Sequence, residues 1–171
     1  MKVILTPFLI LALLGFVASL TAHVAGYMGI GKPFGYDPWP LHMGVFVVWL
    51  PTVLVAIKHT RNIPRNDAWK VILRGCPDWM KNGFYVIFGY AILSFIVFIV
   101  YSTQSSSGND ASVVRGFSGH WLVFYYAAFA TLYSELQLEK QDPIRRCRNG
   151  HVVELGDKYC RDCGEHVGKG Y

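Results

Sequence analysis

Four long runs of uncharged and mostly apolar residues constrain this chain more than any other feature of its sequence. The runs cover residues 3–21, 41–57, 84–101 and 117–133. A helix needs roughly 17–25 residues to cross a hydrocarbon core of about 30 Å, and each run reaches or approaches that length. Because a bilayer offers no water to unpaired backbone groups, a span of this kind must be helical. The sequence therefore predicts an all-α membrane protein, a bundle of four transmembrane helices.

The charge content of the chain supports this prediction. Only 16% of the residues are charged and 53% are apolar, whereas a soluble domain usually carries about a quarter charged residues. The four runs contain no acidic residue, lysine or arginine. Intramembrane charges mark ion and proton paths, so their absence disfavours an ion-coupled transporter.

The fourth run is the least hydrophobic of the four. It includes Ser118, His120 and Thr131 as well as two adjacent tyrosines. We expect this helix to pack against its neighbours more than against lipid.

The basic residues predict the orientation of the bundle. Residues 58–81 hold six basic and two acidic side chains, a net charge of +4, while residues 22–40 and 102–116 each hold one of either sign. Basic loops remain on the cytosolic side of a membrane. The sequence therefore predicts a multi-pass protein of an inner or plasma membrane with both termini cytosolic. Since topology explains the basic excess, we do not expect a nucleic-acid partner.

The connection between the second and third runs mixes apolar and charged residues. Asn66 or Asp67 is a suitable N-cap for a short helix, which would end by Gly75 because Pro77 disfavours a helical conformation at Cys76. Such a segment either lies on the membrane surface as an amphipathic piece or packs on the bundle as an ordinary loop. Cys76 is correspondingly either a reactive thiol or an unremarkable one.

The C-terminal tail contains the most specific chemical pattern. Cys147 and His151 are separated by three residues, Cys160 and Cys163 by two, and eight residues stand between the two pairs. Three thiolates and one imidazole complete the tetrahedral shell of Zn²⁺ and leave no open position, as in structural rather than catalytic zinc sites. His166 is an alternative to His151 as the fourth ligand.

This segment resembles the small zinc ribbons attached to many prokaryotic proteins, which have a CxxGH first knuckle and a CxxCG second knuckle. The matching residues here are 147–151 and 160–164, and the resemblance covers about an eighth of the chain. It implies two short hairpins that hold one zinc ion, and a module that contacts proteins or nucleic acids. The expected domains are thus a four-helix transmembrane domain, 1–140, and a cytosolic zinc-ribbon tail, 141–171.

Three histidines lie at the ends of the predicted spans. His23 ends the first span, His42 begins the second and His120 begins the fourth, so all three would lie near the outer membrane surface. Neutral imidazoles bind haem iron, copper and zinc, and a helix bundle can bring such residues to one level. An outward metal or haem site is therefore one hypothesis. Plain packing is the other, because His42 shares a helical face with Phe46 and Trp49.

Three functions fit these features. The favoured one is an accessory or scaffold protein whose cytosolic zinc ribbon binds a protein partner. The second is a membrane metal- or haem-binding protein with an outward histidine site. The third is a membrane enzyme whose glycine- and proline-rich outer loops hold a lipid-like substrate. The sequence contains no evident nucleophile–base arrangement, phosphate-binding glycine loop or pair of catalytic carboxylates, so an enzyme is the weaker expectation.

Overall fold

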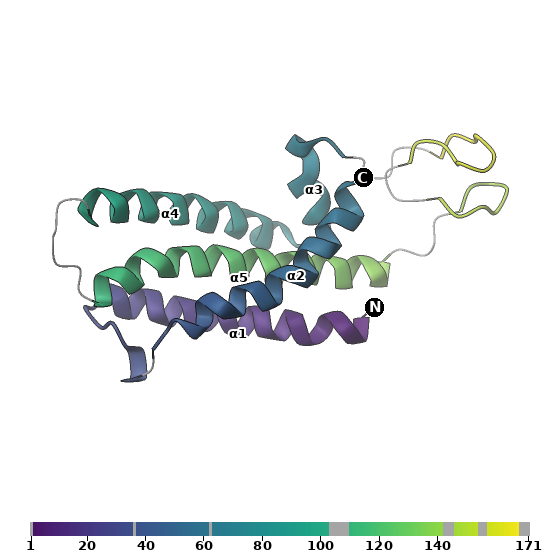
Figure 1. Cartoon of the computed structure of the whole chain (residues 1–171). Coiled ribbons are helices and arrows are strands. Elements are labelled where there is room, and N and C mark those ends of the chain that lie inside the picture. The colour runs from purple at the N-terminus through teal and green to yellow at the C-terminus, as the bar shows by residue number, and fades with distance from the viewer. Residues whose placement is uncertain are drawn as a thin grey trace. The chain divides into compact units, whose positions relative to one another are not determined.

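The chain folds into helices followed by a small irregular tail. The computed structural model describes residues 2–35, 37–61, 63–102, 110–141, 146–153 and 157–167. The elements in order are α1 (Lys2–Tyr27), the 3₁₀ helix η1 (Pro33–Gly35), α2 (Pro40–Thr60), the 3₁₀ helix η2 (Arg65–Asp67), α3 (Ala68–Ile72), α4 (Asp78–Ser102) and α5 (Asp110–Gln141) (Figure 1). The chain divides into two compact units, Met1–Leu136 and Gln137–Tyr171.

Three of the helices have the properties of membrane spans. Val3–Tyr27 in α1, Pro40–Thr60 in α2 and Asp78–Val100 in α4 are long and apolar enough to cross a bilayer. Many of their large apolar side chains point away from the protein, and Leu50 and Leu93 leave 67% and 64% of their surface exposed. Water is a poor solvent for apolar faces of this extent. These features indicate a multi-pass membrane protein.

Helix α5 is the centre of the first unit. Figure 1 shows it running between α4 and α1. Trp121, Ala128 and Leu132 are almost completely buried along it. The low hydrophobicity of the fourth run thus has a structural reason, because its side chains contact other helices instead of lipid. The structure confirms a fourth helix here, and its crossing of the membrane stays a prediction.

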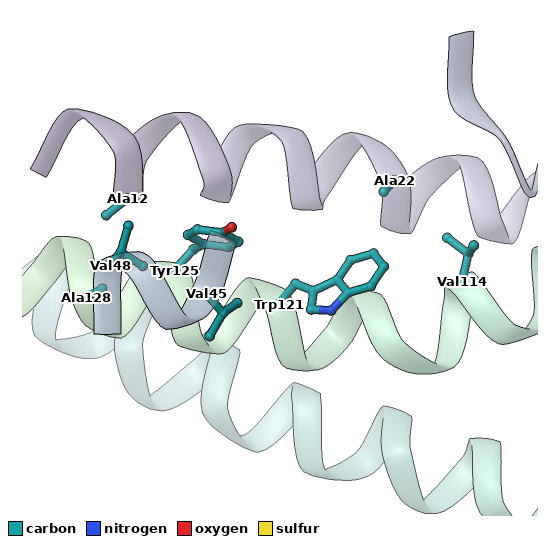
Figure 2. Close-up of a cluster of buried hydrophobic side chains, with 8 residues drawn as sticks. All are labelled: Ala12, Ala22, Val45, Val48, Val114, Trp121, Tyr125 and Ala128. Carbon is teal, nitrogen blue, oxygen red and sulfur yellow. The ribbon is translucent and has the colours of Figure 1, made fainter. Parts of the chain in front are cut away.

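A cluster of small and aromatic side chains joins α5 to α1 and α2. Figure 2 shows its members: Ala12, Ala22, Val45, Val48, Val114, Trp121, Tyr125 and Ala128. Tyr125 of α5 lies between α1 and α2 and donates a hydrogen bond to the Leu41 carbonyl at 2.8 Å. A Cβ atom on Gly15 of α1 or Gly44 of α2 would overlap this tyrosine. Two glycines on different helices therefore create the space that one aromatic side chain fills.

A second cluster joins the connection after α2 to α4 and α5. It contains Ile72, Leu73, Cys76, Met80, Phe84, Tyr126, Ala127 and Ala130. The short helix α3 ends before Gly75, as the sequence predicts. Ile72 and Leu73 are buried against the bundle, so the structure favours the packed loop over a helix lying free on the membrane surface.

Cys76 belongs to this packed loop and has the properties of a structural thiol. Its side chain is 4% exposed, and its Sγ donates to the Ala130 carbonyl at 3.2 Å. Burial raises the pKa of the Cys76 thiol to about 11. Because the thiolate is the reactive form, the structure favours the interpretation of Cys76 as an unreactive residue.

Candidate metal centre

The first pair of predicted ligands lies on a short hairpin at the start of the tail. Arg146 and Val152 form an antiparallel bridge, and the Cys147 N–H donates to the His151 carbonyl at 3.0 Å. Gly150 turns the chain with a φ of 86°, a left-handed conformation that glycine adopts without steric cost. The turn brings the Cys147 sulfur to 3.5 Å from Nδ1 of His151.

The second pair lies on a hairpin of the same kind. Tyr159 and His166 form its antiparallel bridge, the Cys160 N–H donates to the Glu165 carbonyl at 2.8 Å, and Gly164 turns the chain with a φ of 71°. The imidazole of His166 packs edge-on against the Tyr159 ring at 5.1 Å between centroids. His166 therefore packs within this hairpin and does not belong to the group of metal ligands.

The four ligand atoms of Cys147, His151, Cys160 and Cys163 all lie within 4.8 Å of one another. Zinc–sulfur bonds of about 2.3 Å and zinc–nitrogen bonds of 2.0–2.1 Å require tetrahedral edges of about 3.8 Å between two sulfurs and about 3.6 Å between sulfur and nitrogen. The Cys147–Cys163 sulfur distance is 3.6 Å, and the distances from His151 Nδ1 to two cysteine sulfurs are 3.5 and 3.8 Å. This group could hold one metal ion such as zinc.

The surroundings of the cluster fit a structural metal site. Cys147 and Cys160 are buried beside Val153, which is too small a core to hold two hairpins together without a metal. A backbone hydrogen bond from Glu165 lowers the pKa of Cys163 to about 6, so this thiol is ionised near neutral pH and ready to bind a cation. The Glu165 carboxylate also accepts the Arg148 N–H at 2.8 Å and connects the hairpins.

His23, one of the three predicted outer histidines, is occupied by other polar groups. It lies buried on α1, where Nδ1 is 2.6 Å from the Ser118 hydroxyl and Nε2 is hydrogen-bonded to the Tyr90 hydroxyl. The Tyr90 hydroxyl in turn donates toward the Tyr27 hydroxyl at 3.4 Å. Both ring nitrogens therefore have hydrogen-bond partners, and neither is directed at an open position.

The other two histidines pack among aromatic rings. His42 accepts a hydrogen bond from the Trp121 indole at 3.1 Å, and the His120 ring meets Phe95 edge-on at 4.4 Å between centroids. Among the described residues, only the tail cluster is a group of three or more ligating side chains close enough to share an ion. The structure does not bring His23, His42 and His120 together in such a group, and a haem or copper site there stays a prediction without structural support.

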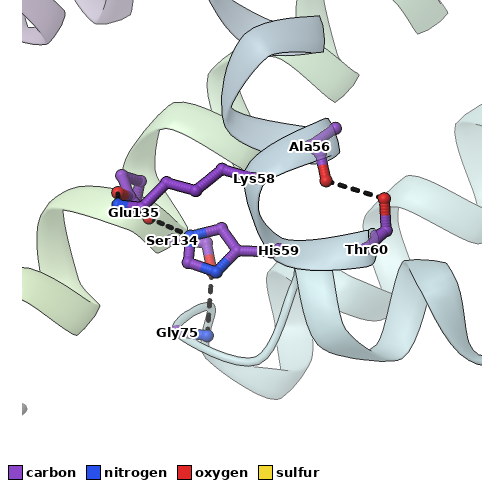
Figure 3. A network of polar contacts seen from close by, with 7 residues as sticks. All are labelled: Ala56, Lys58, His59, Thr60, Gly75, Ser134 and Glu135. Carbon is purple, nitrogen blue, oxygen red and sulfur yellow. Dashed lines mark hydrogen bonds and ion pairs between the residues drawn. The ribbon is translucent and has the colours of Figure 1, made fainter. Parts of the chain in front are cut away.

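Sequence reasoning missed a buried ionic network at the end of α2. The Glu135 carboxylate is 2% exposed and accepts from Lys58 Nζ at 2.7 Å and from His59 Nε2 (Figure 3). The neighbouring Ser134 hydroxyl accepts the Gly75 N–H at 2.9 Å. One signal could have revealed this network. Two basic residues directly follow the second apolar run and an acidic residue closely follows the fourth, and both ends are predicted at the same membrane surface.

Comparison with known proteins gives no relative from which a function could be inferred. No protein-family model matches the chain. The curated proteins and the solved structures give no match either. The chemistry of the tail and of the bundle therefore carries the functional argument.

Proposed function

We propose that this chain is a membrane accessory or scaffold protein whose C-terminal zinc ribbon binds a protein partner in the cytosol. The observation that carries the proposal is the set of four ligand atoms in the tail, with spacings that match the edges of a zinc tetrahedron. A shell of three thiolates and one imidazole has no open position for substrate. The metal would therefore stabilise a contact module instead of catalysing a reaction.

The exposed apolar residues of the tail supply a contact surface. Val152 and Tyr159 stand on different hairpins and leave 57% and 59% of their surface exposed. Aromatic residues contribute strongly to protein interfaces because they bury a large area at a small entropic cost. The packing of Tyr159 against His166 limits the motion of the ring before a partner binds. These features favour a protein partner, with Tyr159 as the main contact.

The proposal has a direct test on the purified chain. One zinc per chain is expected by metal analysis, and the double substitution Cys160→Ser/Cys163→Ser should abolish it. Cys76→Ser is the matched control. Cys76 is not one of the four ligands and bonds to Ala130 instead, so this variant should keep its zinc. Retention of zinc by the double variant would show that other residues hold the metal.

A second substitution separates zinc binding from partner binding. Tyr159→Ser should keep the zinc, since Tyr159 is no ligand, and should release the partner. Cross-linking in cells, followed by comparison of the wild type, Tyr159→Ser and the zinc-free variant, identifies proteins lost from both variants. If no protein depends on both the zinc and Tyr159, the docking function is refuted even when the zinc site is intact.

The topology proposed with this function has α5 as a fourth span and both termini in the cytosol. The basic residues of 58–81 and the burial of α5 support it. Four crossings put the two ends of the chain on the same side, whereas three crossings would put them on opposite sides. Reporters fused before Met1 and after Tyr171, in two separate fusion proteins, should both be active in the cytosol. Activity on opposite sides would rule out the fourth crossing.

A second candidate, an enzyme acting on a lipid-like substrate, rests on a groove beside α1. The groove has a volume of about 490 Å³ and is lined by Leu20, Thr21, Val24, Ala25, Met28, Ile30 and Pro33. Such a lining suits an acyl chain. Its hydroxyl group, on Thr21, donates to the Val17 carbonyl at 3.0 Å. The groove therefore supports binding of a lipid tail more than a reaction on it.

A further inference from the structure

The lipid-facing side of α2 ends in an arginine. Leu54 and Ile57 leave 61% and 56% of their surface exposed on this side. Arg61 follows Ile57 by four positions and therefore lies on the same helical face, because the helical backbone continues through it with a φ of −51° and a ψ of −35°. Four residues advance a helix by about 6 Å. This step carries the exposed Arg61 from the hydrocarbon edge to the level of the lipid headgroups.

A tryptophan marks the same membrane level on α4. Trp79, Val86 and Leu93 are spaced seven residues apart and leave 68%, 69% and 64% of their surface exposed. Tryptophan favours the boundary between lipid and water, so Trp79 places the start of α4 at that boundary. Ala56 of α2 packs against the cluster that contains Phe84 of α4. The end of α2 and the start of α4 thus lie at the same surface.

Among the described residues, three carboxylates near this surface are already neutralised by lysines. Lys70 pairs with Asp67 at 2.9 Å and Lys81 pairs with Asp78 at 3.0 Å. Lys58 pairs with the buried Glu135.

Two arginines of the same segment are left without such a partner. Arg61 and Arg65 are exposed, and no ion pair with a carboxylate involves either of them within the part of the chain that the structure describes. Arg61 follows the last residue of α2 and Arg65 begins η2 four positions later. Two uncompensated guanidinium groups thus directly follow the span and attract an anion that belongs to the membrane.

We propose that Arg61 and Arg65 bind the headgroup of an anionic phospholipid in the leaflet where α2 ends and α4 begins. A guanidinium group donates two parallel hydrogen bonds to phosphate oxygens. A headgroup with a net negative charge also gains from the basic excess of residues 58–81. This site is independent of the proposed docking function of the tail, and it assigns a lipid class as the ligand of the connection between α2 and α4.

The test measures lipid binding to the full-length protein purified in a nonionic detergent. Native mass spectrometry gives the apparent affinity for phosphatidylglycerol and for phosphatidylcholine with the same acyl chains. The wild type should bind phosphatidylglycerol more tightly, and the affinity should fall as ionic strength rises. Removal of one charge near the surface should weaken binding about 5-fold, so Arg61→Gln/Arg65→Gln should weaken it about 25-fold. Equal affinities of the wild type for the two lipids would overturn the proposal.

Two matched variants complete the experiment. Lys32→Gln removes an exposed charge from the segment between α1 and η1 and should leave phosphatidylglycerol binding unchanged. Arg61→Lys/Arg65→Lys keeps the charges but loses the paired guanidinium hydrogen bonds, so its affinity should lie between those of the wild type and the glutamine variant. A loss in Lys32→Gln as large as in the double glutamine variant would overturn the proposal. Displacement of the lipid by millimolar inorganic phosphate would identify free phosphate as the ligand instead. If the glutamine variant does not fold, the salt dependence of the wild type decides, and an affinity independent of salt refutes the site.

Discussion

Removal of the negative charge from Glu135 is the sharpest test of how the bundle is held together. The carboxylate is buried and receives hydrogen bonds from Lys58 and His59, both in the last turn of α2. Glu135→Gln keeps the shape of the side chain, removes its charge and replaces one carboxylate oxygen by an NH₂ group. One of the two hydrogen bonds is then lost, because the amide nitrogen is a donor that faces another donor, and the other bond is made to an uncharged carbonyl oxygen.

The expected loss follows from the burial of each partner. A hydrogen bond to a charged group contributes roughly 1.5–3 kcal/mol and a neutral one roughly 0.5–1.5 kcal/mol. The Lys58 side chain is 53% exposed and the His59 side chain 14%, so solvent weakens the lysine bond more than the histidine bond. Glu135→Gln should therefore destabilise the protein by about 2–3 kcal/mol. Lys58→Met should cost about 1 kcal/mol or less, because His59 still pairs with the carboxylate.

Equilibrium unfolding in mixed micelles of SDS and a nonionic detergent, followed by tryptophan fluorescence at neutral pH, measures these free energies. Lys70→Met is the matched control. It removes the same kind of charge from the exposed pair with Asp67 and should leave the free energy of unfolding unchanged. The reasoning is refuted if Glu135→Gln costs no more than Lys58→Met. A loss in Lys70→Met equal to that in Lys58→Met would show that loss of charge, and not burial of the pair, sets the stability.

Three further outcomes are expected. Gly15→Ala should destabilise the bundle by roughly 1–3 kcal/mol because its Cβ would overlap the tyrosine ring of α5, whereas Gly89→Ala, which meets open space, should be neutral or stabilising in the same unfolding assay. The rate of maleimide labelling of Cys76 should rise about tenfold per pH unit from pH 7 to 10, because its pKa of about 11 keeps the thiol protonated in this range. Mass spectrometry of the peptide that contains Cys76 measures the rate. A plateau of the rate near pH 8 would contradict the burial of this thiol. A zinc chelator should make residues 146–167 sensitive to protease while the helices stay resistant, and equal resistance of the tail on a gel would argue against a structural metal.

The helices could be predicted from the sequence because they depend on local hydrophobicity, although their ends could not. The run at 84–101 corresponds to a helix that begins at Asp78, and the run at 117–133 to a helix that spans Asp110–Gln141. Hydrophobicity reports which residues meet lipid or core, whereas a helix continues into water wherever its backbone stays paired. The predicted spans were therefore shorter than the helices that contain them.

The candidate metal site could be predicted from the sequence, whereas the ionic network of Glu135 could not. Cys147 and His151 are four positions apart, so a single turn brings them together and the spacing alone predicts the pair. Glu135 and His59 are separated by 76 positions, and their contact depends on the rotation of two helices about their axes. That rotation follows from side-chain packing such as the wedge of Tyr125 between α1 and α2. It also leaves His23, His42 and His120 outside any common ligand group, which no spacing in the sequence indicates.

The burial of α5 has a consequence for how the protein is made. The three helices with the strongest hydrophobicity precede α5 in the chain, and each is long and apolar enough to cross a bilayer before α5 leaves the ribosome. Helix α5 is synthesised last of the four, when the surfaces that will cover Trp121 and Leu132 already exist. For the proposed fourth span, helices already in place can then receive a helix that is too polar to insert on its own. The helix that depends most on contacts with the others is thus also the one that is synthesised after them.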